Sequence, residues 1–129
     1  MLGTNARQLA PATTAEICQI AEVLVDPQLQ NRSVRITGKL ETYDAQRKVA
    51  RVSFQDVSMT VETHRLALEN LRLQLGSMYQ FLGETYACKQ GGPVEVRLVA
   101  RVARNVDSLD IDLFIETLAM RRQFLASRG

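Results

Sequence analysis

Residues Ser33–Tyr43 read SVRITGKLETY, and this stretch decides the fold. Apolar or small side chains alternate there with charged and polar ones, which is the period of a β-strand that buries one face. Gly38 lies near the centre of the stretch, and a glycine inside a strand is typical of a bend or a bulge. The stretch therefore predicts a long strand that curls into a small barrel.

Four further strands are expected downstream, each bounded by turn residues. They span 50–54, Met59 to about Ala67, Ser77–Tyr86 and Val94–Ala103. Alternate residues form the expected inner face of the last strand, namely Val94, Val96, Leu98, Ala100 and Val102. The stretch 68–76 fits either a short helix or a loop.

Helical patterns flank the strands on both sides. Thr13 and Glu16 fit a capping box, which predicts a short helix over Thr14–Leu24 that closes one end of the domain. Asp107 or Asp110 caps a final helix. Five strands followed by a helix is the pattern of the OB-fold, a five-stranded, partly open barrel, and another small all-β barrel is the alternative. We expect one domain, with a tail and short helix packed on the barrel over 1–32, the barrel over 33–106 and a partner-binding helix over 107–129.

The composition is that of an ordinary globular domain. The chain has 129 residues, 46% of them apolar and 23% charged, and a net charge of +2. Such a chain buries a real core, and its overall charge does not direct it to nucleic acid, membranes or acidic substrates. We find no leader-like segment and no apolar run of the about 18 residues that a membrane span needs. Cys18 and Cys88 lie far apart, which favours free thiols in a reducing, intracellular compartment over one long-range disulfide.

No group of residues predicts catalysis. His64 falls in an expected strand without a nearby Ser or Cys nucleophile, and with Cys18 and Cys88 it cannot supply the four ligands of a structural zinc site. The Gly91-Gly92-Pro93 turn lacks the lysine and the helix of a phosphate-binding loop. The carboxylates Asp107, Asp110 and Asp112 fit the start of a helix. We expect a protein that is not an enzyme and that holds no metal or cofactor.

The expected final helix, Ile111–Leu125, carries two apolar stripes. At about 100° per residue, one stripe comprises Ile111, Phe114, Ile115, Leu118 and Leu125. The second stripe comprises Leu113, Met120 and Phe124, with Arg121, Arg122 and Arg128 around it. One stripe suffices to seat a helix on its own domain, so the second predicts a partner protein. The alternative is that both stripes are buried within a single domain.

A second candidate surface is the polar face of the strands. Its basic residues are Arg35, Lys39, Arg51, Arg97 and Arg101, and the tyrosines expected near it are Tyr43 and Tyr79. A basic stripe fits a phosphate backbone, but single-strand binding also needs aromatic platforms, and these are scarce here. A solvated face interleaved with Glu41 and Glu95, or a contact of Arg35 and Lys39 with a protein partner, are the alternatives. We expect weak, salt-sensitive DNA binding by the isolated chain.

Three stretches carry a resemblance to a known family. They are Val34–Leu40 (VRITGKL), Gly76–Glu84 (GSMYQFLGE) and Ala103–Asp110 (ARNVDSLD). Together with the helix that follows, their order and spacing resemble the smallest subunit of the CST telomere-capping complex, most nearly its plant-type members. The resemblance covers Ser33–Arg128 and leaves out the first 32 residues. The smallest subunit of replication protein A has the same architecture and is the alternative family.

The resemblance implies a function. A CST subunit of this kind is a non-catalytic OB-fold protein that binds the larger central OB-fold subunit, and its terminal helix would place Phe124 and Arg128 on the partner side. The assembled complex holds single-stranded telomeric DNA in the nucleus and supports fill-in by polymerase α–primase. A stand-alone, weak single-strand-binding module is the remaining alternative.

Overall fold

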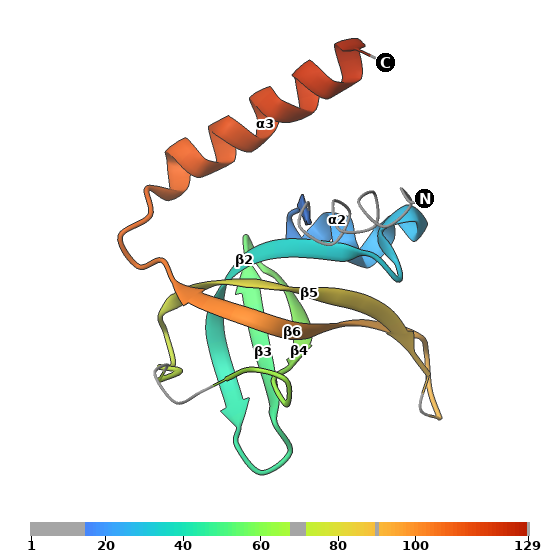
Figure 1. The fold of residues 1–129 in the computed structure, drawn as a ribbon, viewed down its shortest axis with the longest axis vertical. Coiled ribbons are helices and arrows are strands. Elements are labelled where there is room, and N and C mark those ends of the chain that lie inside the picture. Colours follow the sequence, from blue (N-terminus) through green and yellow to red (C-terminus); the bar gives the residue numbers. More distant parts are fainter. Residues whose placement is uncertain (1–14, 68–71, 90, 129) are drawn as a thin grey trace, which may run out of the picture.

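A computed structural model describes residues 15–67, 72–89 and 91–128, and the side chains of Arg122 and of residues 124–128 lie outside the description. Figure 1 shows the elements along the chain. The strands are β1 (Glu16–Ile17), β2 (Ser33–Asp44), β3 (Val49–Phe54), β4 (Val57–Glu62), β5 (Met78–Cys88) and β6 (Glu95–Asn105). The helices are α2 (Ile20–Val25), the 3-10 turn η1 (Pro27–Leu29) and α3 (Ile111–Arg128). None of the described helices is long and apolar enough to cross a membrane.

The strands close into the expected five-stranded barrel. The sheet order is β1-β2-β3-β4-β6-β5, and β2 also pairs with β5, which closes the ring. β6 pairs antiparallel with β5 and parallel with β4, the latter through Thr60–Glu62 and Arg97–Val99. β1 adds a short parallel edge to β2. The alternation of the sequence sets the inner faces, and the alternate residues Ala50, Val52 and Phe54 of β3 are buried as expected.

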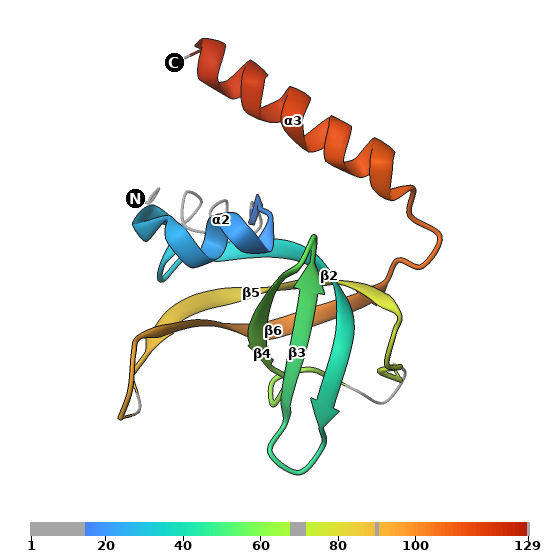
Figure 2. The same ribbon diagram turned by 180° about the vertical axis from the view of Figure 1, so that it is seen from behind.

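Gly38 lets the short helix α2 sit close to β2. A Cβ built on Gly38 would lie 3.2 Å from Cδ1 of Ile20 and 3.1 Å from the backbone oxygen of Ser53. Ile20 and Val23 are buried on the α2 face that covers the barrel, and Figures 1 and 2 show α2 lying across one end. A register shift follows at once, between Leu40 and Thr42, where β2 bends.

A bulge between β5 and β6 changes which side chains face the core. Leu82 pairs with Val102 and Gly83 with Ala100, so Arg101 is the additional residue. A Cβ on Gly83 would lie 1.9 Å from the backbone oxygen of Val99, so this close approach requires glycine. The expectation that Val102 faces inward is wrong, because the bulge turns the strand by one residue and leaves Val102 49% exposed.

Three other expectations about the elements need correction. The first helix begins at Ile20, because Glu16–Ile17 pairs with β2 as β1; the Glu22 side chain then accepts the backbone N–H of Gln19 at 2.8 Å. The third strand ends at Glu62, and Val94 lies before β6 and is exposed. The last strand therefore begins at Glu95. The open choice for 68–76 needs no correction: residues 68–71 lie outside the described residues, and 72–76 form no helix or strand, which agrees with the loop alternative.

α3 starts where the capping expectation placed it. The Asp110 carboxylate accepts the backbone N–H of Leu113 at 3.1 Å. Phe114 meets Phe54 edge to face, with ring centroids 6.1 Å apart, and Ile111 and Ile115 pack on the core. Figures 1 and 2 show that the rest of α3 runs away from the barrel. The first turns therefore anchor this helix.

Candidate protein and nucleic-acid interfaces

The second apolar stripe of α3 is open to solvent where it is described. Leu113 is 57% and Met120 64% exposed, and Arg121 beside them is exposed. On the other side of the helix Leu118 is buried and Phe114 packs on the barrel. The side chains of Phe124 and Arg128 lie outside the described residues. The two stripes thus have different environments, and the alternative of burying both within the domain does not hold for Leu113 and Met120.

The outward face of β2, β5 and β6 carries a second exposed surface, here called the outer sheet face. A depression of about 130 Å³ is formed there by Arg35, Gln80, Leu82, Val102 and Arg104. Arg104 donates a hydrogen bond to Oε1 of Gln80 at 2.7 Å. Within the described part of the chain, neither Arg35 nor Arg104 forms an ion pair with a carboxylate. The outer sheet face therefore combines exposed aliphatic surface with two unpaired arginines.

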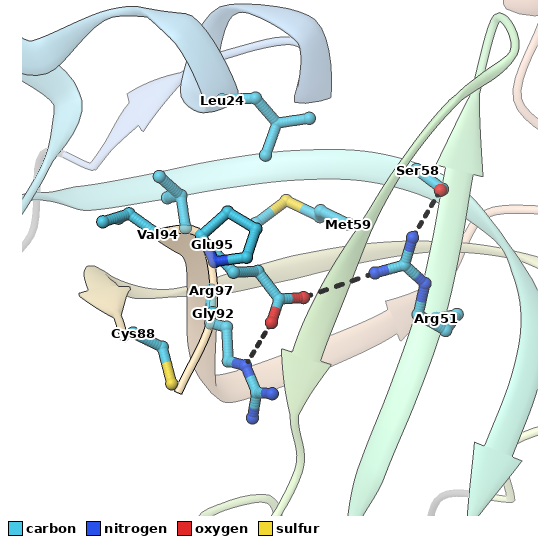
Figure 3. A pocket seen from close by; sticks show the side chains of 11 residues that line it. Leu24, Arg51, Ser58, Met59, Cys88, Gly92, Val94, Glu95 and Arg97 are labelled. Carbon is cyan, nitrogen blue, oxygen red and sulfur yellow. Dashed lines mark hydrogen bonds and ion pairs between the residues drawn. The ribbon is translucent and has the colours of Figure 1, made fainter. Parts of the chain in front are cut away.

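A larger cavity lies on the barrel between α2 and the loop that joins β5 to β6. Its volume is about 620 Å³, and Figure 3 shows it from close by. Leu24 of α2, Met59 of β4 and Val94 of the loop give it an apolar end. Arg51, Glu95 and Arg97 give it a charged end, where dashed lines join them in Figure 3. An adjoining cavity of about 350 Å³ continues past Arg51 and Arg97 to Tyr43 and Arg47. We call the two cavities together the barrel groove.

The arginines in the barrel groove are tied to carboxylates. Arg97 lies 3.1 Å from Glu95 and 3.3 Å from Glu62. Arg51 lies 3.5 Å from the same Glu95 and donates to the Thr60 hydroxyl at 2.7 Å. The Thr60 hydroxyl, and after it the Arg97 guanidinium, hold the pKa of the Glu95 carboxyl below its ordinary value. This neutralisation weakens the groove as a track for phosphates.

Tyr86 on β5 is bonded to one of the same carboxylates. Its hydroxyl donates to the Glu62 carboxylate, whose other oxygen lies 3.8 Å from Nδ1 of His64. Burial, followed by the bond to the Glu62 carboxylate, raises the pKa of Tyr86 to about 12. Glu62 thus binds both Arg97 and Tyr86, and these bonds hold the Arg97 side chain in place at the barrel groove.

The residues predicted to bind nucleic acid do not lie together on one face. Tyr43, Arg51 and Arg97 line the barrel groove, whereas Arg35 lies on the outer sheet face and Lys39 is exposed on β2. The two remaining residues, Tyr79 and Arg101, lie elsewhere.

Tyr79 and Arg101 do not stand free on a binding face. Tyr79 is buried, because it occupies the inward phase of β5; its ring packs against Phe81, with centroids 5.9 Å apart. The Tyr79 hydroxyl accepts the N–H of Gln74 at 2.8 Å and donates to the carbonyl of Arg72 at 3.0 Å. The prediction of Tyr79 as a base-stacking platform is therefore wrong. Arg101, the bulge residue, is bound to Glu84 at 2.8 Å.

Sequence reasoning missed Leu24, which lines the barrel groove, and two residues of the network around Arg97, namely Glu62 and Tyr86. They come from α2, β4 and β5 and carry no local motif. The cross-strand register, which pairs Tyr86 with Arg97, brings the network together. His64 follows β4 in a turn instead of lying in a strand. Cys18 and Cys88 are both buried and are not joined by a disulfide, and in the described ranges no cluster of His, Cys, Asp or Glu could hold a metal ion.

Comparison with known proteins decides between the two families that the sequence left open. The family model of telomere-capping CST complex subunits (Ten1) matches residues 12–128. The chain belongs to the Ten1 family of CST subunits. The match begins well before Ser33, so β1 and α2 are part of the family pattern, contrary to the shorter extent of the resemblance. As a telomere-capping subunit of this family the protein is non-catalytic, which confirms that expectation.

A relative agrees with this membership, and solved structures share the fold. The CST complex subunit TEN1 of Arabidopsis thaliana is 31% identical over 93 residues, which are 72% of this chain and 70% of the relative. The crystal structure of Ten1 from S. pombe has a TM-score of 0.68 at 14% identity, covering 85% of this chain and 99% of that one.

Two further structures show the same fold. That of the S. pombe Stn1–Ten1 complex has a TM-score of 0.69 at 13% identity, covering 87% of this chain and 95% of that one. An OBody bound to hen egg-white lysozyme has a TM-score of 0.53 at 14% identity, covering 73% and 97%. These likenesses confirm the predicted OB-fold.

Proposed function

We propose that this Ten1-family chain binds the central OB-fold subunit of its CST complex, a Stn1-type protein. The contact is made by the second apolar stripe of α3, which comprises Leu113, Met120 and Phe124. The observation that carries the proposal is the pair Leu113 and Met120, exposed on a helix whose other side is anchored by Phe114. Aliphatic and Met side chains with an arginine fringe are typical of an interface core. The S. pombe relative was solved as a Stn1–Ten1 complex, which supports a partner of this type.

The outer sheet face offers a second contact for the same partner. Arg35 and Arg104 lack carboxylate partners among the described residues, and Leu82 and Val102 lie between them. A partner's acidic groups would pair with the arginines while its apolar groups cover the aliphatic floor. We expect the α3 stripe to contribute most of the affinity and the arginines to contribute orientation and association rate.

Placing a negative charge in the exposed apolar stripe of α3 tests the proposal. We would co-express the chain with the central CST subunit of the same organism and measure the complex by size-exclusion chromatography with light scattering. Met120→Glu and Leu113→Glu should each remove most of a one-to-one complex, and Phe124→Ala should weaken it by about 2 kcal/mol or more, as loss of an interface anchor does. Ala119→Glu is the matched control, since Ala119 is exposed on the same helix but off the stripe. Equal complex formation by all variants would refute the interface.

We further propose that the protein serves telomeric single-stranded DNA through the assembled complex, in the nucleus, in support of polymerase α–primase fill-in. Arg51 and Arg97 are already paired with Glu95, so the isolated chain should bind DNA weakly and lose that binding as salt rises. Fluorescence anisotropy with a telomeric oligonucleotide at two salt concentrations tests this. Nanomolar affinity of the isolated chain at physiological salt would contradict it.

A further inference from the structure

The barrel groove lies where two strands of the barrel separate. β4 and β6 pair only through Thr60–Glu62 and Arg97–Val99 among the described residues. Ser58 and Met59 on β4 pair with β3, and Glu95 and Val96 on β6 pair with β5, but no β4–β6 pair joins these four residues across the larger cavity that they line. The ladder between β4 and β6 thus stops at this cavity, and the strand edges beside it suit an extended peptide, which binds by adding main-chain hydrogen bonds to such edges.

The end of the groove beneath α2 is aliphatic. Leu24 and Met59 form its sides, and Val94, which is 57% exposed, stands at the mouth beside Pro93 (Figure 3). A volume of about 620 Å³ holds a large aliphatic side chain together with its backbone. Nucleic-acid bases need flat aromatic partners, and among the described residues that line this larger cavity none is aromatic. This end therefore favours an aliphatic anchor over a base.

Two arginines at the other end are incompletely paired. Glu95 is shared by Arg51 and Arg97, and the Arg51 side chain remains 43% exposed. Arg47 lines the adjoining cavity and, within the described residues, forms no ion pair. One more carboxylate beside Arg51 and Arg47 would complete the pairing. A single acidic group satisfies this need.

We propose that the barrel groove binds an extended acidic peptide segment of another protein, with an aliphatic residue under α2 and a carboxylate at Arg51 and Arg47. This surface is separate from the α3 stripe and the outer sheet face. It would let the subunit hold a second protein while α3 stays engaged. The site depends on three features together: the open β4–β6 edges, the aliphatic end and the shared Glu95.

A direct binding experiment tests the proposal. The probe is a fluorescein-labelled peptide in which a leucine is flanked by aspartates, compared with a copy that carries lysines instead and with a thymidine oligonucleotide. Anisotropy gives the affinities, and amide shifts of the ¹⁵N-labelled protein locate the site. We expect the acidic peptide to bind at least about tenfold more tightly than the lysine copy, a difference of about 1.4 kcal/mol, and to shift the amides of Met59, Val94 and Val96.

Surface variants keep the experiment interpretable. Val94→Glu and Arg47→Glu change exposed side chains of the groove and should each weaken the acidic peptide about tenfold or more. Leu75→Glu and Arg72→Glu are the controls, because both residues are exposed and neither lines the groove. Circular dichroism shows that each variant is folded. Equal affinity for both peptides, shifts outside the groove, or groove shifts with the oligonucleotide alone would overturn the proposal.

Discussion

Removing one oxygen atom from Tyr79 tests whether this residue supports the barrel. In Tyr79→Phe the ring remains packed against Phe81, and only the hydroxyl is lost. That hydroxyl joins β5 to the segment before it, through the N–H of Gln74 and the carbonyl of Arg72. The variant therefore isolates two hydrogen bonds without opening a large cavity.

The expected loss of stability follows from those two bonds. Each is worth about 0.5–1.5 kcal/mol net. Arg72 and Gln74 are exposed, so water can replace part of the hydrogen bonding that the hydroxyl provides to their backbone groups. We expect the free energy of unfolding to fall by about 1–2 kcal/mol. For a chain of this size, with an unfolding entropy of about 2.1 cal/mol/K per residue, the melting temperature should fall by about 4–7 °C.

Thermal unfolding followed by circular dichroism measures this loss. Tyr43→Phe is the matched control, since the described residues give no hydrogen bond to the Tyr43 hydroxyl; its melting temperature should stay near that of the wild type. A wild-type melting temperature for Tyr79→Phe, together with reduced oligonucleotide affinity, would refute the structural role and restore the residue to a binding face.

Three further predictions concern the barrel and its helix. Gly83→Ala should destabilise the fold by about 3 kcal/mol or more, since the new Cβ meets the backbone of β6, whereas Gly92→Ala, with open space around it, should be close to neutral in urea unfolding. Tyr86 should titrate at about pH 12, so its contribution to stability is complete below pH 10 and is lost as the pH rises through about 12; ultraviolet titration should lack this late step in Tyr86→Phe. Phe114→Ala should free α3 from the barrel, seen as faster amide exchange in its first turns while β-sheet exchange stays slow.

The strands could be predicted from the sequence because apolar and polar side chains alternate along them with a period of two residues. Val34, Ile36 and Leu40 are buried as the alternation of β2 requires. The phase of β5 could not be predicted, since Met78, Tyr79 and Phe81 place large apolar groups on both faces. The first helix failed for a different reason: Gln19 and Glu22 have the same spacing as Thr13 and Glu16, and only the pairing of β1 with β2 decides between them.

A candidate surface could be predicted from the sequence where its residues lie close together within one helix or strand. The exposure of Leu113 and Met120 follows from helical spacing within one element. The charge pairs of the barrel groove join Arg51 on β3 to Glu95 on β6, so they depend on a register that no short motif contains. The outward turn of Val102 depends on the bulge opposite Gly83, and the alternation continues through Arg101 without a break.

The position of β6 in the barrel also determines the order of events during synthesis. β6 is the last strand made, and it alone joins β4 to β5. Until β6 has been made, the edges of β4 and β5 that it covers have no partner strand. Unpaired strand edges of this kind favour association with other chains. Pairing between such distant segments is slow, in milliseconds to seconds. Because α3 emerges after β6, its exposed apolar residues Leu113 and Met120 reach solvent only once the strands needed to close the barrel have been made.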